Sequence, residues 1–118
     1  MDLLVEGLDQ DSANIGLAVE DIETVVLKRL PAAGLYDAER REHLYVRVTV
    51  TRQAFSATME YRRPVYEPVS DRMGFATTWD TGSIGTHDEN ANTILIQVWR
   101  HRDRFIDEYL RVNADACG

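Results

Sequence analysis

Residues 75–90 read FATTWDTGSIGTHDEN and divide the chain into two kinds of hydrophobic periodicity. Before this stretch the apolar residues mostly recur at every second position, which is typical of strands, and after it they follow a helical period. The stretch therefore predicts a last strand over Phe75–Trp79, then a glycine turn, then the start of a final helix. In that turn Gly82 and Gly85 are expected to adopt positive φ angles.

The final helix is predicted to run from about residue 90 almost to the C-terminus. Asp88 or Asn90 can cap its N-terminus. It is the longest predicted element, with roughly six turns. Its apolar side is formed by Ile94, Leu95, Val98, Trp99, Phe105, Ile106, Tyr109 and Leu110.

The first third of the chain predicts one strand and one helix. Leu3–Leu8 is a short apolar segment, and the polar cluster at residues 9–14 is typical of a turn. From Ala18 to Ala33 the apolar residues recur on one helical stripe, with acidic residues in the first turns and basic residues near the end. Gly34 is well suited to follow the end of this helix.

Two further segments alternate between apolar and polar residues, as half-buried strands do. In Leu44–Thr51 every second residue is Leu or Val, so one face is predicted to pack against the helices. Phe55–Glu67 alternates in the same way. Pro64 removes a ladder donor, so this strand is expected to lie at an edge, to be bulged or to end there. Residues 37–43 and 69–74 are predicted loops.

These elements give the order β-α-β-β-β-α in a single domain covering residues 1–118. The fold class is α+β, a two-layer sandwich in which both helices cover one face of a four-stranded, mostly antiparallel sheet. Short links predict an antiparallel meander for the last three strands, and the helical crossover permits parallel pairing of the first strand.

The composition excludes several classes of protein. A net charge of −7 disfavours nucleic acid and anionic lipid headgroups as general partners. No apolar run approaches the ~20 residues of a membrane span. Cys117 is the only cysteine, so no internal disulfide can form. The start at Met1 shows no basic, apolar leader, which fits either a cytosolic protein or a secreted one whose leader has been removed.

One short motif suggests an enzyme. Asp80-Thr81-Gly82-Ser83 matches the signature of aspartic proteases, in which two such loops bring two aspartates together to share a proton. A chain with one loop would have to dimerise, so the alternative function is a dimeric hydrolase that uses Asp80. Only one helix follows the motif and no second motif is present, which favours a tight strand-to-helix turn instead.

The same stretch could bind an anion or a metal. Gly82–Thr86 precedes a helix N-terminus, but the P-loop lysine is missing and neighbouring carboxylates repel a phosphate. His87, Asp88 and Asp80 could hold a divalent metal. Capping of the helix by the loop carboxylates is the simpler interpretation, so we expect no metal and no cofactor.

A small basic cluster lies on the final helix at Arg100, His101, Arg102 and Arg104. Acidic residues at helical spacing explain it as surface ion pairing, and a docking patch for an acidic partner is the alternative. His43 and His101 are expected to be solvated.

The sheet face turned away from the helices is the predicted binding surface. It carries Tyr45, Arg47 and Arg62, although a simply solvated face is common in antiparallel sheets. The full set of candidate binding residues is Tyr45, Arg47, Arg62, Trp79, Asp80, Gly82, Ser83 and Gly85.

The C-terminal half resembles a group of small, uncharacterised bacterial envelope proteins. The resemblance rests on Ala76-Thr-Thr-Trp79, on the loop Gly82-Ser-Ile-Gly85, and on Phe105-Ile106 followed by Tyr109-Leu110. It implies a periplasmic or secreted protein from which a leader was removed; a cytoplasmic location is the alternative.

The order of elements is also similar to that of small envelope lipoproteins that assist lipid transport. Together the two resemblances imply a non-enzymatic binding or assembly module with an envelope protein or a lipid-like ligand as partner. A subunit that only assembles with itself is a third hypothesis.

Overall fold

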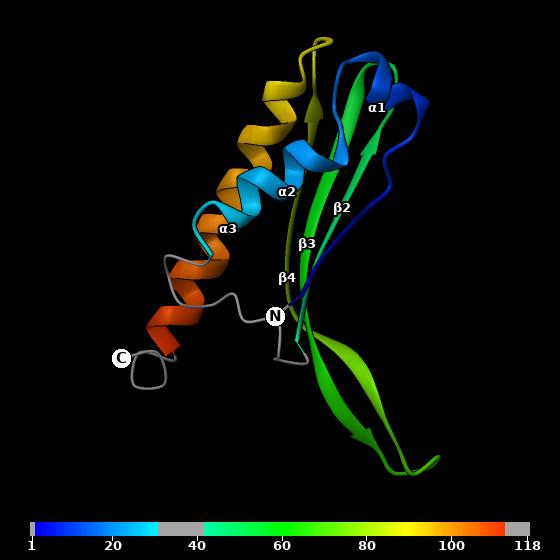
Figure 1. The fold of residues 1–118 in the computed structure, drawn as a ribbon, viewed down its shortest axis with the longest axis vertical. Coiled ribbons are helices and arrows are strands. Elements are labelled where there is room, and N and C mark those ends of the chain that lie inside the picture. Colours follow the sequence, from blue (N-terminus) through cyan, green and yellow to red (C-terminus); the bar gives the residue numbers. More distant parts are fainter. Residues whose placement is uncertain (1, 31–41, 113–118) are drawn as a thin grey trace.

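A computed structural model of the protein describes residues 2–30 and 42–112. Along the chain the elements are β1 (Asp2–Glu6), α1 (Gln10–Asn14), α2 (Val19–Leu27), β2 (His43–Val50), β3 (Ala54–Glu67), β4 (Arg72–Thr86) and α3 (Ala91–Val112). The predicted α+β sandwich is confirmed, with α1 as an additional short helix (Figure 1).

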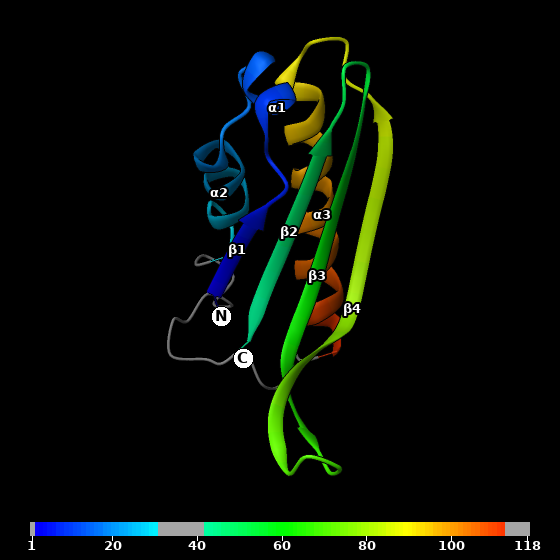
Figure 2. The same cartoon turned by 90° about the vertical axis from the view of Figure 1, so that its right-hand side faces the viewer.

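The four strands form one mixed sheet in the order β1-β2-β3-β4 (Figure 2). β1 pairs with β2 in parallel, with Leu3 opposite Leu44. β2 with β3, and β3 with β4, are antiparallel, with Val46 opposite Met59 in the first pair. The predicted meander is confirmed, and the first strand makes the parallel pairing that the helical crossover permits.

Helices α2 and α3 cover the same face of the sheet (Figure 1). The alternation of Leu44–Thr51 is confirmed, because its Leu and Val side chains are buried between sheet and helices. The core is completed by apolar residues of the other elements: Leu17, Ile22, Val26, Leu30, Phe55, Ala57, Met59, Ile94, Val98, Phe105 and Ile106.

The described residues between β1 and β2 form two helices, α1 and α2, where the sequence predicted one. α2 begins after Ala18, whose backbone N–H donates to the Asp21 carboxylate at 3.0 Å. The predicted helix is wrong from Lys28 to Leu30, because α2 ends at Leu27 and residues 28–30 form a turn. The rest of the prediction, from residue 31 to Ala33, lies outside the described residues, as do the Gly34 end and loop residues 37–41. The polar cluster predicted as a turn contains α1. There Asp9 and Ser12 exchange two hydrogen bonds, each 3.2 Å long, in a capping box.

The predicted glycine turn at residues 82–85 is wrong. β4 continues through it to Thr86, so Gly82 and Gly85 lie within the strand, and neither has a positive φ angle. These glycines instead allow close packing. A Cβ at Gly82 would lie 3.2 Å from the Ala57 carbonyl oxygen, and one at Gly85 would lie 3.3 Å from the Phe55 ring.

The turn into α3 comes later, at residues 87–90. Asp88 and Glu89 are the residues with positive φ angles, 49° and 58°. The predicted cap is confirmed for Asn90, whose side-chain oxygen accepts a hydrogen bond of 3.0 Å from the backbone N–H of Asn92.

The effect predicted for Pro64 is also confirmed. β3 pairs with β2 only as far as Arg62, and the β3–β4 register shifts between Tyr61 and Arg62. From this bulge on, β3 and β4 form a hairpin over residues 62–77, which we call the arm, and β2 pairs with none of it beyond Arg62. It projects beyond the helices and bends to the side opposite them (Figure 1). The predicted loop at residues 69–74 is reduced to a turn at 68–71.

None of the described helices is both long and apolar enough to cross a membrane.

Candidate functional site

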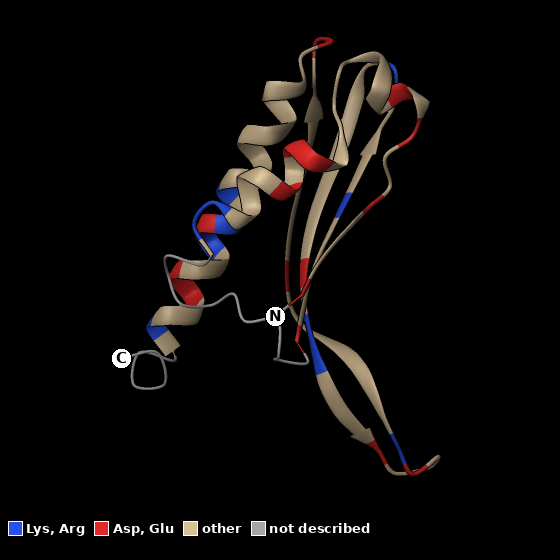
Figure 3. Ribbon diagram, viewed as in Figure 1, with Lys and Arg blue, Asp and Glu red and all other residues tan. Residues whose placement is uncertain are grey.

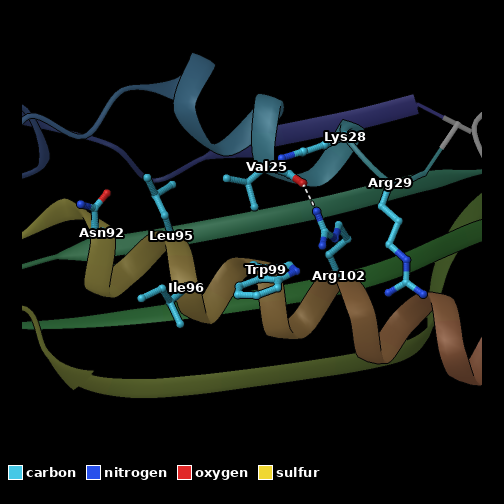
Figure 4. A pocket seen from close by; sticks show the side chains of 8 residues that line it. All are labelled: Val25, Lys28, Arg29, Asn92, Leu95, Ile96, Trp99 and Arg102. Carbon is cyan, nitrogen blue, oxygen red and sulfur yellow. Dashed lines mark hydrogen bonds between the residues drawn. The ribbon is translucent and has the colours of Figure 1, made fainter. Parts of the chain in front are cut away.

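A groove runs along the outer side of the helical layer, where α2 lies beside α3 (Figure 4). Its volume is about 760 Å³, and it is open to solvent. It is lined by Val25, Lys28, Arg29, Asn92, Leu95, Ile96, Trp99 and Arg102. From Asn92 to Arg102 the groove follows α3 for about 15 Å, since a helix rises 1.5 Å per residue.

The groove exists because α3 carries two adjacent apolar stripes. Ile94 and Val98 belong to the stripe that is buried against the sheet. Leu95 and Trp99 follow Ile94 and Val98 in the sequence. They are four residues apart, so they form a second stripe beside the first, and this stripe faces α2. Their partner on α2 is Val25, next to the fully buried Val26. The second stripe has no sheet to cover it, so part of it stays exposed.

Arg102 closes one end of the groove from within the protein. Its side chain is buried, and Nη1 donates to the Val25 carbonyl oxygen at 2.6 Å (dashed line in Figure 4). Its Nε and Nη2 donate to Asp103 at 3.1 and 2.9 Å. Partial burial acts to raise the pKa of Asp103, but hydrogen bonds from Arg29 and Arg102 outweigh it and hold this pKa below its usual value.

The basic residues at this end differ in how far they are neutralised. Arg29 lies 2.8 Å from Asp103 and 3.7 Å from Asp107, and Arg102 also pairs with Asp103. Lys28 is exposed and has no carboxylate partner among the described residues. Figure 3 shows the contrast between this basic end of α2 and its acidic start. In the part of the chain that the structure describes, the positive charge of Lys28 is therefore unpaired beside the apolar side chains that line the groove.

The interpretation of the basic cluster on α3 needs correction. Arg102 and His101 are buried, so they do not belong to a surface cluster. Nε2 of His101 lies 2.9 Å from the Ser83 hydroxyl. Burial, and then the positive charge of Arg104, lower the pKa of His101. The expectation that His101 is solvated is wrong, because its neutral ring fills a site between α3 and β4.

The open face of the sheet brings three of the predicted binding residues together. Tyr45 is buried there beneath two guanidinium groups, those of Arg62 at 4.1 Å and Arg47 at 5.8 Å from the ring centre. Each arginine is also paired with a carboxylate, Arg47 with Glu6 and Arg62 with Glu60 at 2.7 Å. These contacts satisfy the cluster internally, and a ligand would have to compete with them.

The other predicted residues are split between the two faces of β4. Asp80 and Gly82 lie on the open face, opposite Glu60 and Thr58. The remaining three, Trp79, Ser83 and Gly85, alternate with them and face the helices. The eight candidates therefore do not form one site. A dimeric hydrolase would need the Asp80 side chains of two chains beside each other. Because Asp80 lies on the open face of β4, the open faces or the outer edges of the two β4 strands would have to meet.

Trp79 belongs to an aromatic cluster at the other end of α3. Its ring centre lies 5.3 Å from that of Phe105, which in turn is 5.5 Å from Tyr61 and 5.9 Å from Tyr109. The indole N–H donates to Glu108, and this bond is the main cause that lowers the pKa of Glu108. Burial, followed by the effect of Glu42, raises the pKa of Tyr61. These contacts give Trp79 a role in packing.

His87 lies outside any metal site. Its Nδ1 accepts from the backbone N–H of Glu89 at 2.9 Å, so Nε2 carries the proton and donates to the Thr51 carbonyl at 2.8 Å. The ring is buried and ties the β2–β3 turn to the loop before α3. Within residues 2–30 and 42–112 no group of three or more His, Cys, Asp or Glu side chains could hold a metal ion.

The groove was not predicted from the sequence, although the second apolar stripe on α3, Leu95 and Trp99, was a signal for it.

No protein-family model, curated protein or solved structure matches this chain.

Proposed function

We propose that this protein is a binding module that holds an amphiphilic ligand, with an apolar chain and one anionic headgroup, in the groove between α2 and α3. The observation that carries the proposal is the exposure of Trp99 and Ile96 beside Lys28, which has no carboxylate partner within residues 2–30 and 42–112. The two apolar side chains are 49% and 43% exposed.

The apolar chain of the ligand would lie on the floor formed by Val25, Leu95, Ile96 and Trp99. Full burial of one large apolar side chain contributes roughly 1.5–3 kcal/mol, so covering the exposed halves of Ile96 and Trp99 contributes about 2 kcal/mol. The groove is about 15 Å long, which suits an extended hydrocarbon chain better than a compact polar metabolite.

The headgroup would lie at Lys28. Arg29 and Arg102 are already paired with Asp103, and Lys28 has no partner among the residues that the structure describes. The ammonium of Lys28 is therefore the group that would meet a carboxylate or phosphate. The protein as a whole carries a charge of −7, so anions are repelled at long range. Recognition of the headgroup therefore depends on close contact rather than on electrostatic steering.

The cellular setting of the proposal is the bacterial periplasm. This location rests on the resemblance of the C-terminal half to small envelope proteins, and lipid-like molecules that cross this compartment need proteins that cover their apolar chains. Function and location are supported by different observations, so each can be tested alone.

The test uses Trp99 as the reporter. In a Trp79→Phe background Trp99 is the only tryptophan, and titration with dodecanoate is expected to shift its emission to shorter wavelength in a saturable manner. Lys28→Gln should weaken binding of the carboxylate about tenfold, as expected for loss of a partly exposed charged hydrogen bond. It should leave binding of the neutral alcohol dodecanol unchanged.

Arg100→Gln is the matched control, because Arg100 is exposed on α3 and does not line the groove. It removes the same charge and should change the affinity for dodecanoate less than twofold. The proposal is wrong if dodecanoate causes no saturable shift of Trp99, or if both substitutions weaken binding equally.

A further inference from the structure

A second cavity lies on the helix side of the sheet, between the C-terminal end of α3 and the base of the arm (Figure 1). We call it the arm pocket. Its volume of about 750 Å³ lies within the range of small-molecule sites. It is separate from the groove, because the two share none of the described residues that line them.

The floor of the arm pocket is aromatic. It is formed by Tyr61 of β3, Trp79 of β4, and Phe105 and Tyr109 of α3. The ring of Phe105 is buried at the centre of this cluster, and the other three rings are half-buried around it, so they present part of their surface to the pocket. Aromatic rings favour tilted and edge-to-face contacts, so the ring of a ligand can extend the cluster in the same way.

Two arginines at the rim are the charged groups that a ligand would meet. Arg63 on the arm and Arg111 in the last turn of α3 both line the pocket. Neither has a carboxylate partner in the part of the chain that the structure describes. A third arginine, Arg104, pairs with Glu108 at 3.4 Å, and Glu108 also accepts a hydrogen bond from the indole of Trp79.

A β-bulge adds a hydroxyl group to the lining. In the β3–β4 register Tyr61 lies opposite Trp79 and Arg62 lies opposite Thr77, so Thr78 is the extra residue of β4. Thr78 lines the arm pocket. Bulges are frequent beside active sites, where they redirect a side chain, and this one lies where the arm leaves the sheet.

The acidic residues of the pocket leave the two arginines unneutralised. Asp80 lies on the open face of β4, opposite Glu60, whereas the aromatic floor faces the helices. Glu108 is already occupied by Arg104. The described lining therefore keeps two unpaired positive charges in a chain whose net charge is −7.

The chemistry of these groups selects the ligand. Guanidinium groups bind phosphate and carboxylate oxygens through paired hydrogen bonds. A phosphate monoester carries nearly two negative charges at neutral pH and has three terminal oxygens, whereas a carboxylate has one charge and two oxygens. Two separate guanidinium groups and a hydroxyl group therefore match a phosphate better than a carboxylate.

We propose that the arm pocket binds a small aromatic phosphate, whose ring packs against the aromatic floor and whose phosphate group is held by Arg63 and Arg111. Inorganic phosphate would leave the floor uncovered, and an uncharged aromatic molecule would leave both arginines without a partner. The site is independent of the groove and takes a ligand of different chemistry.

The test uses Trp79 as the reporter. In a Trp99→Phe background Trp79 is the only tryptophan, and titration with phenyl phosphate is expected to change its fluorescence in a saturable manner. Arg63→Gln and Arg111→Gln should each weaken binding about tenfold, as expected for loss of a partly exposed charged hydrogen bond. Cyclohexyl phosphate keeps the charge but lacks the aromatic ring, so it should bind about fivefold more weakly.

Arg72→Gln is the matched control, because Arg72 is exposed on the arm and does not line the pocket. It removes the same charge and should change the affinity for phenyl phosphate less than about twofold. Lys28→Gln in the groove should also leave this affinity unchanged, so the two ligand sites are tested separately. Calorimetry on the wild-type protein measures the same dissociation constant without the Trp99 substitution.

Three results would overturn the proposal. The first is the absence of a saturable change at up to about 10 mM phenyl phosphate. The second is equal weakening by Arg72→Gln and by the two pocket substitutions, which would show general attraction of anions to the arm. The third is equal binding of cyclohexyl and phenyl phosphate, which would show that the aromatic floor does not recognise the ring. Arg63 and Arg111 are exposed, so neither substitution is expected to disturb the fold, and circular dichroism checks this.

Discussion

Replacement of Arg102 by alanine is the most informative test of how the helical layer is held together. The buried guanidinium group contacts both helices at once, through the carbonyl oxygen of Val25 on α2 and the carboxylate of Asp103 on α3. The Val25 carbonyl belongs to the last turn of α2, where backbone oxygens lack partners within the helix. The substitution therefore removes the cap of α2 and the closed end of the groove together.

The expected loss of stability follows from these contacts. A hydrogen bond from a charged donor to a buried carbonyl contributes about 1.5–3 kcal/mol. The contact with Asp103 contributes less, about 0.5–1 kcal/mol, because Asp103 is partly exposed and keeps Arg29 as a partner. Two buried methylene groups add about 1.6 kcal/mol. Arg102→Ala should thus lower the free energy of unfolding by about 3.5–5.5 kcal/mol, close to the cost of losing one member of a buried ion pair.

Urea unfolding followed by circular dichroism measures this loss as a shift of the midpoint at constant slope. Arg104→Ala is the control on the same helix: its side chain is 61% exposed and pairs with Glu108 at 3.4 Å, so it should cost less than about 0.5 kcal/mol. If Arg102→Ala does not fold, Arg102→Met retains the packing and should cost about 2–4 kcal/mol. The reasoning fails if either Arg102 variant lies within about 0.5 kcal/mol of Arg104→Ala.

Two further predictions concern His101 and the glycines of β4. The pKa of His101 is lowered below 6.5 in the folded state. As the pH falls through 6.5 the unfolded chain therefore binds a proton first and stability is lost, down to the folded pKa. His101→Gln should lack this part of the pH dependence, measured as the difference from wild type in urea midpoints between pH 7.5 and pH 5. Gly82→Ala should cost about 1 kcal/mol, because its Cβ would meet the Ala57 carbonyl, whereas Gly74→Ala, which meets open space, should be neutral or stabilising by up to about 0.5 kcal/mol. Equal effects of the two glycine substitutions would contradict the close-packing argument.

Local periodicity predicted most of the fold, because each signal lay in neighbouring residues. The alternation of Leu44–Thr51 fixed which face of β2 is buried, and the lengths of the links separated the parallel pair from the antiparallel pairs. α1 was missed although its signal was present: the pair Asp9 and Ser12 is a capping box, but a polar cluster is more often a turn. A helix of five residues has little periodicity of its own.

Tertiary contacts decided what the sequence could not. Two glycines within Asp80–Thr86 predicted a turn, and pairing with β3 made the segment a strand instead. From the sequence Arg102 was interpreted as a surface charge, because its partner, the carbonyl of Val25, is distant in the chain. The groove has the same origin, because the second stripe of α3 becomes a binding surface only when α2 is placed beside it.

The parallel pairing of β1 with β2 has a consequence for the order of folding. Residues 7–42 separate these two strands, whereas the antiparallel pairs are joined by the short turns at 51–53 and 68–71. Hairpins with such turns form within about 1–10 μs, and closing a longer loop costs more entropy. β2, β3 and β4 are therefore expected to assemble first, with β1 and α2 added last. The groove between α2 and α3 is then completed only in the final step, so ligand binding would report that folding has finished.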